Sequence, residues 1–277
     1  MNFNLSAVSR ALAWSRALPR ISVMGVPRVG TNFTRAVLET NYRVRVLYNT
    51  YGWKHGLVPN LAADCSLQAQ QARPLVVVKH PLSNLYSLYD YMQSVGMNVR
   101  SGCEDFASFL RQRVIYFCEK SRQCSELRFS NPVQLWNCVV WNHVRFAHQT
   151  GGLVIRYEDM LADPEVSTGR IARHFGLARI GADYSVTAKL TRRMSDKDSL
   201  RQHKYTDGQD FSKQGYFLRG GYLEHYRAED LAFVAEQVDG ELLTELRYSL
   251  EPSHLLGEGP LPRGVLPAHL LQRAEAG

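Results

Sequence analysis

The first residues with a chemical signature form a short loop, GVPRVGT, at residues 25–31. An apolar run precedes it and residues with helical spacing follow it, so we predict a strand, a tight loop and a helix over residues 20–40. Such a loop leaves backbone N–H groups at a helix N-terminus, where the helix dipole favours negative charge. We therefore expect an anion here, with Arg28 as its cation, although a plain turn fits the same residues.

The loop differs from a Walker A motif, which follows the pattern GxxxxGK[ST]. Gly25 and Gly30 have the Walker spacing, but Thr31 and Asn32 stand where the lysine and the hydroxyl residue belong. In a Walker A loop that lysine binds the β- and γ-phosphates and the hydroxyl binds Mg²⁺. The pattern here favours a grip on phosphate or sulfate that uses no metal.

A candidate general base lies in the polar and aromatic segment NTYGWKHG, at residues 49–56. A histidine side chain such as that of His55 has an unperturbed pKa of about 6.5 and can accept a proton, while Lys54 beside it can stabilise negative charge. The segment follows a strand predicted over residues 43–47, and α/β proteins build their sites on such loops. A surface histidine without a catalytic role is the alternative.

A second polar pair follows the most apolar strand of the chain, predicted over residues 74–79. Lys79 ends this strand, and Ser87 lies two turns into a helix that Pro81 begins and Ser83 can cap. We expect Lys79 and Ser87 to converge on a second phosphate. A capped helix with a solvated lysine is the alternative.

These segments belong to an alternation of strands and helices that runs from residue 21 to residue 176. The alternation predicts an α/β fold, a three-layer sandwich with a central parallel sheet. Helices are predicted over residues 104–119 and 132–148, and another follows a strand at residues 152–156. A last amphipathic helix is predicted over residues 231–246.

Composition narrows the class of protein. A chain of 277 residues suits one large domain, and its net charge of +7 favours an anionic ligand, nucleic acid or an acidic membrane surface. Its five cysteines contain no CxxC pair, which predicts reduced thiols in a cytoplasmic protein. The sequence predicts neither a secretion signal nor a membrane span.

We predict three parts: an amphipathic segment at residues 1–19, one domain at residues 20–250 and a Pro- and Gly-containing tail at residues 251–277. The first part either docks on the domain or contacts a membrane peripherally. Within the domain, residues 189–219 are polar and basic, so this stretch either folds over a ligand or is a solvated surface.

Three motifs in one order resemble the sulfotransferase family that uses 3′-phosphoadenosine 5′-phosphosulfate (PAPS). The family signature GxP(R/K)SGTT is similar to residues 25–32, with Val29 and Asn32 in place of Ser and Thr. The second signature, Arg-(Asn/Asp)-Pro-x-Asp-x-x-x-Ser, is similar to residues 79–87, with Lys79 in place of the arginine. The third, RYEDL, is similar to residues 156–160.

The resemblance implies a P-loop NTPase-like sulfotransferase fold, with the first loop on the 5′-phosphosulfate and the second motif on the 3′-phosphate. It implies His55 as the catalytic base, with Glu39 as runner-up, and matches the late basic loop of the family only weakly. The implied catalytic residues are His55, Arg28, Lys54 and Glu39. The implied donor-binding residues are Pro27, Arg28, Val29, Gly30, Thr31, Asn32, Phe33, Lys79, Ser87, Lys213 and Arg219.

The leading hypothesis is therefore a transferase that moves a sulfuryl group from PAPS to a hydroxyl or amine by in-line displacement, with no metal. The acceptor is a small molecule, a carbohydrate or a lipid, and no nucleic acid is expected. One alternative is a P-loop nucleotide or small-molecule kinase, which is disfavoured because the core strand ends in Lys79-His80, a pair that repels Mg²⁺. The other is a non-catalytic basic module that binds nucleic acid or membrane.

Overall fold

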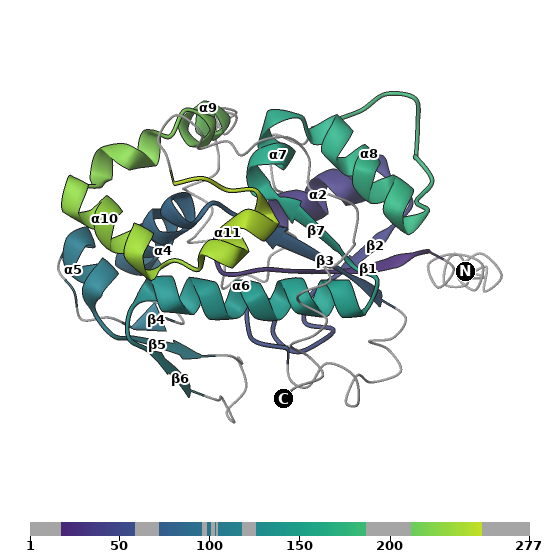
Figure 1. Cartoon of the computed structure of the whole chain (residues 1–277). Helices are drawn as coiled ribbons and strands as arrows, with labels where there is room; N and C mark the ends of the chain where they lie inside the picture. The colour runs from purple at the N-terminus through teal and green to yellow at the C-terminus, as the bar shows by residue number, and fades with distance from the viewer. Residues whose placement is uncertain are drawn as a thin grey trace, which may run out of the picture.

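The fold is built around a four-stranded sheet in the order β2-β1-β3-β7, with every neighbouring pair parallel (Figure 1). A computed structural model describes residues 18–58, 72–95, 99–100, 103, 105–117, 126–186 and 212–250 of the chain. The strands are β1 (Arg20–Met24), β2 (Arg45–Leu47), β3 (Ala72–Val78) and β7 (Leu153–Arg156). The prediction of an α/β fold with a central parallel sheet is confirmed.

Helices cover both faces of this sheet, an arrangement compatible with a three-layer sandwich. Figure 1 shows α6 (Pro132–Gln149) along one side of the strands and α2 (Thr31–Asn41) with α8 (Pro164–Phe175) on the other. Helix α4 (Pro81–Val95) follows β3, and the short α7 (Tyr157–Ala162) follows β7. Because helices lie against both faces, β3 is apolar along nearly its whole length and almost entirely buried.

The connections diverge between β1 and β3. The chain leaves β1 through α2 for β2 on one side, whereas the chain from β3 leads to β7 on the other side. Open α/β sheets bind ligands at such a switch point, outside the carboxyl ends of the strands. The loops after all four strands, which include residues 25–30, 48–56 and 79–80, therefore meet at one edge of the sheet.

Gly25 allows the first of these loops to cross the neighbouring strand closely. A Cβ atom at this position would lie 2.3 Å from the carbonyl oxygen of Val77, a backbone atom of β3 that cannot turn away. Any larger residue would push the loop from the sheet. This contact gives a physical reason for the glycine that begins the loop.

A second, antiparallel sheet differs from the prediction. Its strands are β4 (Val99–Arg100), β5 (Val114–Phe117) and β6 (Glu126–Phe129), in that order. The helix predicted over residues 104–119 is wrong beyond α5 (Phe106–Arg111), because the β-branched and aromatic run VIYF pairs with β6 instead. Asp105 caps α5 by accepting the Ser108 N–H, 2.7 Å away.

Two further helix boundaries differ from the prediction. The last predicted helix is two helices, α10 (Ala228–Gln237) and α11 (Gly240–Leu246), because Asp239 caps a new helix by accepting the Leu242 N–H at 3.0 Å. Helix α4 begins at Pro81, so Ser83 lies inside it and its buried hydroxyl has no hydrogen-bond partner among the described residues.

The remaining elements are α9 (Ser212–Leu218) and the 3₁₀ helix η2 (Gly221–His225). Most of the predicted amphipathic segment at residues 1–19, most of the basic stretch after residue 189 and the tail from residue 251 lie outside the described residues. Of the helices described, none combines the length and apolar character that crossing a bilayer requires.

Candidate active site

The loop after β1 turns through two residues in the left-handed region, Arg28 at φ 75° and Gly30 at φ 86°. Gly30 stands at the N-cap position of α2, and no described side chain caps the helix there. The first turn of α2 also contains no acidic residue. The N-terminal N–H groups of α2 are thus left to a ligand, as an anion site requires.

Lys54 reaches the N-terminus of α2 from the loop after β2. Its Nζ atom lies 3.1 Å from Thr31 Oγ1 and 3.0 Å from Asn32 Oδ1. The ammonium also lies 3.9 Å from the ring centre of Tyr48, whose hydroxyl is 3.1 Å from Asn32 Oδ1. A cation at the positive end of a helix is unfavourable unless an anion joins it, so this cluster strengthens the case for an anion site.

The two departures from the family signature both have structural roles in this loop. Val29 is completely buried and packs in the hydrophobic core, so only its backbone can face a ligand. Asn32 is exposed and accepts hydrogen bonds from Lys54 and Tyr48. Asn32 therefore helps to hold Lys54 beside a loop whose own sequence contains no lysine.

His55 is held as one defined tautomer of the neutral imidazole. Its Nδ1 atom lies 2.6 Å from the carbonyl oxygen of Gly25, and because a carbonyl only accepts, Nδ1 carries the proton and Nε2 the lone pair. Burial of the ring, together with the charges of Lys54 and Arg28, lowers the pKa of His55 to about 3. The imidazole is therefore neutral at neutral pH.

The loop that carries Lys54 and His55 is fixed on two sides. Toward the first loop, the Gly25 N–H donates to the Lys54 carbonyl at 3.0 Å. Toward α6 and β5, His143 Nε2 donates to the Gly56 carbonyl at 2.7 Å, and the Tyr116 hydroxyl donates to the His55 carbonyl. These bonds set the position of the candidate base relative to the first loop.

The structure brings Lys79 and Ser87 together, with 2.8 Å between Nζ and Oγ. Lys79 is only 1% exposed, and its ammonium lies 3.8 Å from the ring centre of Phe217 in α9. The ring of Tyr157 lies 5.3 Å from the same ammonium. The Lys79 ammonium also interacts electrostatically with the buried Glu158 carboxylate. Its hydrogen bond to Ser87 makes this pair a candidate for binding a negatively charged group.

Helix α4 and an aromatic cluster join the two cationic positions. Asn84 in α4 donates from Nδ2 to the carbonyl oxygen of Pro27 at 2.9 Å, which ties the Lys79 segment to the first loop. Phe33 and Phe217 both meet the ring of Tyr157 edge-on, at 6.3 and 5.9 Å between centroids. The segments that carry the two cationic positions are therefore joined through α4 and this aromatic cluster.

Three predicted residues are not brought to this site by a described side chain. Glu39 lies two turns into α2 and accepts the Arg35 Nε–H at 2.8 Å and the Val46 N–H at 2.9 Å, so it closes the edge of β2. Arg219 follows α9, is exposed, and donates from Nε to the carbonyl oxygen of Gly215 at 3.2 Å. The side chain of Lys213 lies outside the described residues.

Arg28 lies with its guanidinium carbon 4.7 Å from the ring centre of Tyr91 in α4. Two residues outside the predicted catalytic and donor-binding residues also contribute to the site. Tyr48 orients Lys54 as described above, and Glu158 accepts the His80 N–H at 3.0 Å and the Tyr248 hydroxyl at 2.8 Å. Glu158 thereby fixes the peptide that follows Lys79, and its place in the RYED segment was the available signal.

Comparison of the chain with protein-family models, curated proteins and solved structures gave no match. Its function therefore has to be inferred from the residues themselves.

His143 provides a test of how the site is held. Burial lowers the pKa of His143 to about 4, against about 6.5 in the unfolded chain. Between these values the unfolded state binds a proton that the folded state does not, so stability falls as the pH falls. His143→Gln removes this contribution, and wild-type protein should lose about 1 kcal/mol more per pH unit than the variant.

Urea unfolding at about pH 7, 6 and 5 measures this difference. His174→Gln, at an exposed position in α8, is the control and should follow the wild type. Equal slopes for wild type and His143→Gln would show that His143 is not held neutral in the fold.

Proposed function

We propose that this protein is a PAPS-dependent sulfotransferase with a P-loop NTPase-like fold, acting in the cytoplasm. The observation that carries the proposal is a pair of cationic positions beside the neighbouring strands β1 and β3. Lys54 reaches the N-terminus of α2, the helix that follows β1, and Lys79 with Ser87 lies after β3. PAPS carries phosphate groups at its 5′ and 3′ positions. Two adjacent phosphate positions suit this donor better than a linear triphosphate.

In this proposal the backbone of residues 27–33 binds the 5′-phosphosulfate at the start of α2. Arg28 and Lys54 neutralise the charge that develops on the departing 3′-phosphoadenosine 5′-phosphate (PAP). Lys79 and Ser87 bind the 3′-phosphate, with Lys79 as a point charge where the family has a bidentate arginine.

We assign the general base to His55 on the geometry of its ring, which directs the proton to Nδ1 and leaves the lone pair on Nε2. Its pKa of about 3 makes it a weak base in the unliganded fold, and an anion bound beside Lys54 and Arg28 would raise that pKa. As the acceptor oxygen or nitrogen forms its bond to sulfur, the bond between sulfur and the phosphate oxygen of PAP breaks, and Nε2 takes the acceptor's proton. After the product departs, the His55 imidazolium releases this proton to solvent. Positioning by the Gly25 carbonyl keeps Nδ1 from competing for that proton.

One observation favours a second candidate, a P-loop kinase. Lys54 lies 3.1 Å from Thr31 Oγ1 and could serve as the cation that a Walker A loop takes from its own sequence. The buried Lys79 at the end of β3, however, stands where phosphoryl-transfer enzymes hold a magnesium-binding acid. The sulfotransferase is therefore the better supported of the two.

Thermal unfolding in a concentration series of PAP and of ATP with Mg²⁺ separates these functions. Wild-type protein should be stabilised by PAP and not by ATP with Mg²⁺, because a ligand that binds the folded state raises its melting temperature. Lys79→Met keeps the side-chain stem but removes the charge, and should weaken PAP binding roughly 10- to 100-fold.

Arg113→Gln, at an exposed position before β5, is the matched control and should bind PAP like the wild type. Stabilisation by ATP with Mg²⁺ and none by PAP would contradict the sulfotransferase and favour the kinase.

His55→Gln tests the base once screening with a PAPS-regenerating assay has supplied an acceptor. Glutamine can still donate to the Gly25 carbonyl but cannot take a proton, so turnover should fall by roughly 100-fold or more. PAP affinity should stay within about twofold of wild type, because His55 is not proposed to bind the donor phosphates. His174→Gln is the control, and near-normal turnover in His55→Gln would remove His55 from the role of base.

A further inference from the structure

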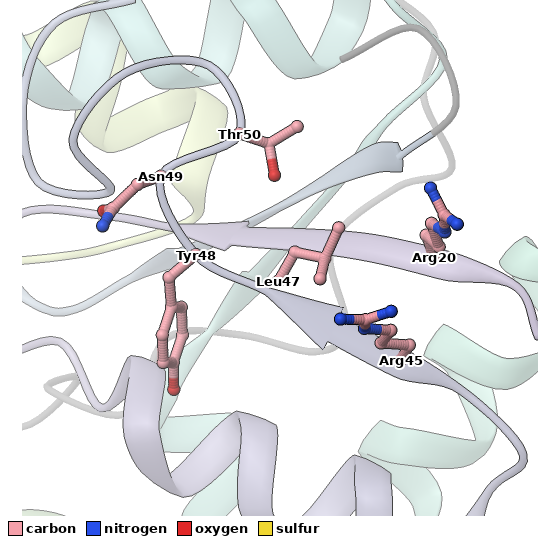
Figure 2. A pocket seen from close by; sticks show the side chains of 6 residues that line it. All are labelled: Arg20, Arg45, Leu47, Tyr48, Asn49 and Thr50. Carbon is pink, nitrogen blue, oxygen red and sulfur yellow. The ribbon is translucent and has the colours of Figure 1, made fainter. Parts of the chain in front are cut away.

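A pocket of about 420 Å³ lies along the edge strand β2 (Figure 2). In Figure 2 two arginines stand at one end of the pocket, and Tyr48, Asn49 and Thr50 stand at the other. Its lining residues are Arg20, Arg45, Leu47, Tyr48, Asn49 and Thr50.

The two arginines are neighbours across the sheet. Arg20 of β1 and Arg45 of β2 are partners in the parallel register, so their side chains leave the same face of the sheet. Like charges directly opposite each other destabilise a sheet. Among the described residues, neither Arg20 nor Arg45 forms an ion pair. Each arginine–carboxylate ion pair among those residues involves a different arginine. An anion held between the two guanidinium groups would offset this repulsion.

The pocket shares one wall with the candidate active site. The Tyr48 ring contacts the Lys54 ammonium at 3.9 Å, and its hydroxyl is 3.1 Å from Asn32 Oδ1 at the start of α2. Tyr48 lies three positions after Arg45, just past the end of β2, which corresponds to roughly 10 Å of extended chain. A molecule lying along β2 therefore spans from the arginine pair to the loop of Lys54 and His55.

We infer that this pocket binds an anionic group of the acceptor, a carboxylate, phosphate or sulfate. The assignment of the bound molecule as acceptor rests on the proposed function, whereas the anion site itself does not. The Thr50 hydroxyl adds a hydrogen-bonding group, and Leu47 provides a small apolar surface between the two ends. The arginine pair thus makes the occupant an acidic molecule.

The double variant Arg20→Gln/Arg45→Gln tests this inference, because glutamine keeps hydrogen-bonding capacity and removes charge. Calorimetric titration uses two matched pairs of probes, tetragalacturonate with neutral maltotetraose and glucose 6-phosphate with glucose. Wild-type protein should bind at least one acidic probe more tightly than its neutral counterpart, and the double variant should weaken that binding roughly 10-fold or more. Higher salt should weaken it as well.

Arg113→Gln is the control, and PAP affinity should stay within about twofold of wild type in both variants. The melting temperature of the double variant should be at least that of wild type, because a like-charge pair is removed. The single variants, each expected to show part of the loss, give the same answer if the double variant proves unstable.

The outcomes separate the inference from the proposed function. Binding of the acidic probes that is absent or independent of the arginines, or an equal loss of PAP binding in the double variant, would overturn the inference. Wild-type protein that binds an acidic probe through the arginines but does not bind PAP would overturn the proposed function and keep the anion site.

Discussion

A positive charge held against the positive end of a helix is the constraint on which the site depends. Lys54 is kept there by Thr31, Asn32 and Tyr48, and its loop is tied to the first loop by two bonds at Gly25. Those same two bonds set the tautomer and position of His55. An anion at the α2 N-terminus would relieve the unfavourable field, so binding of the ligand and ordering of the base are parts of one arrangement.

The second cationic position depends on a buried carboxylate. Burial raises the pKa of Glu158 above its usual range, and the His80 N–H and the Tyr248 hydroxyl compensate by donating to it. Since Tyr248 follows α11, the last described segment of the chain supports the loop after β3. Breaking either bond would leave a buried polar group without its partner, which is more costly than the bond itself is worth.

Much of the sheet could be predicted, because β1, β3 and β7 are apolar runs. The end of α8 could also be predicted, because Gly176 follows the helix in the left-handed region. Local spacing also brought Lys79 and Ser87 together correctly. The contact of Lys54 with Thr31 could not be predicted, because it depends on the path of a loop 23 residues away. Likewise, the pairing of Arg20 with Arg45 follows only from the strand register, and helix α2 carries Glu39 away from the site to the edge of β2.

A crystal structure of the protein with bound PAP tests the central claim most directly. The 5′-phosphate should lie at the N-terminus of α2 within hydrogen-bonding distance of Lys54 Nζ, and the 3′-phosphate should contact Lys79 Nζ and Ser87 Oγ. PAP bound elsewhere, or with its two phosphates against neither lysine, would contradict the account.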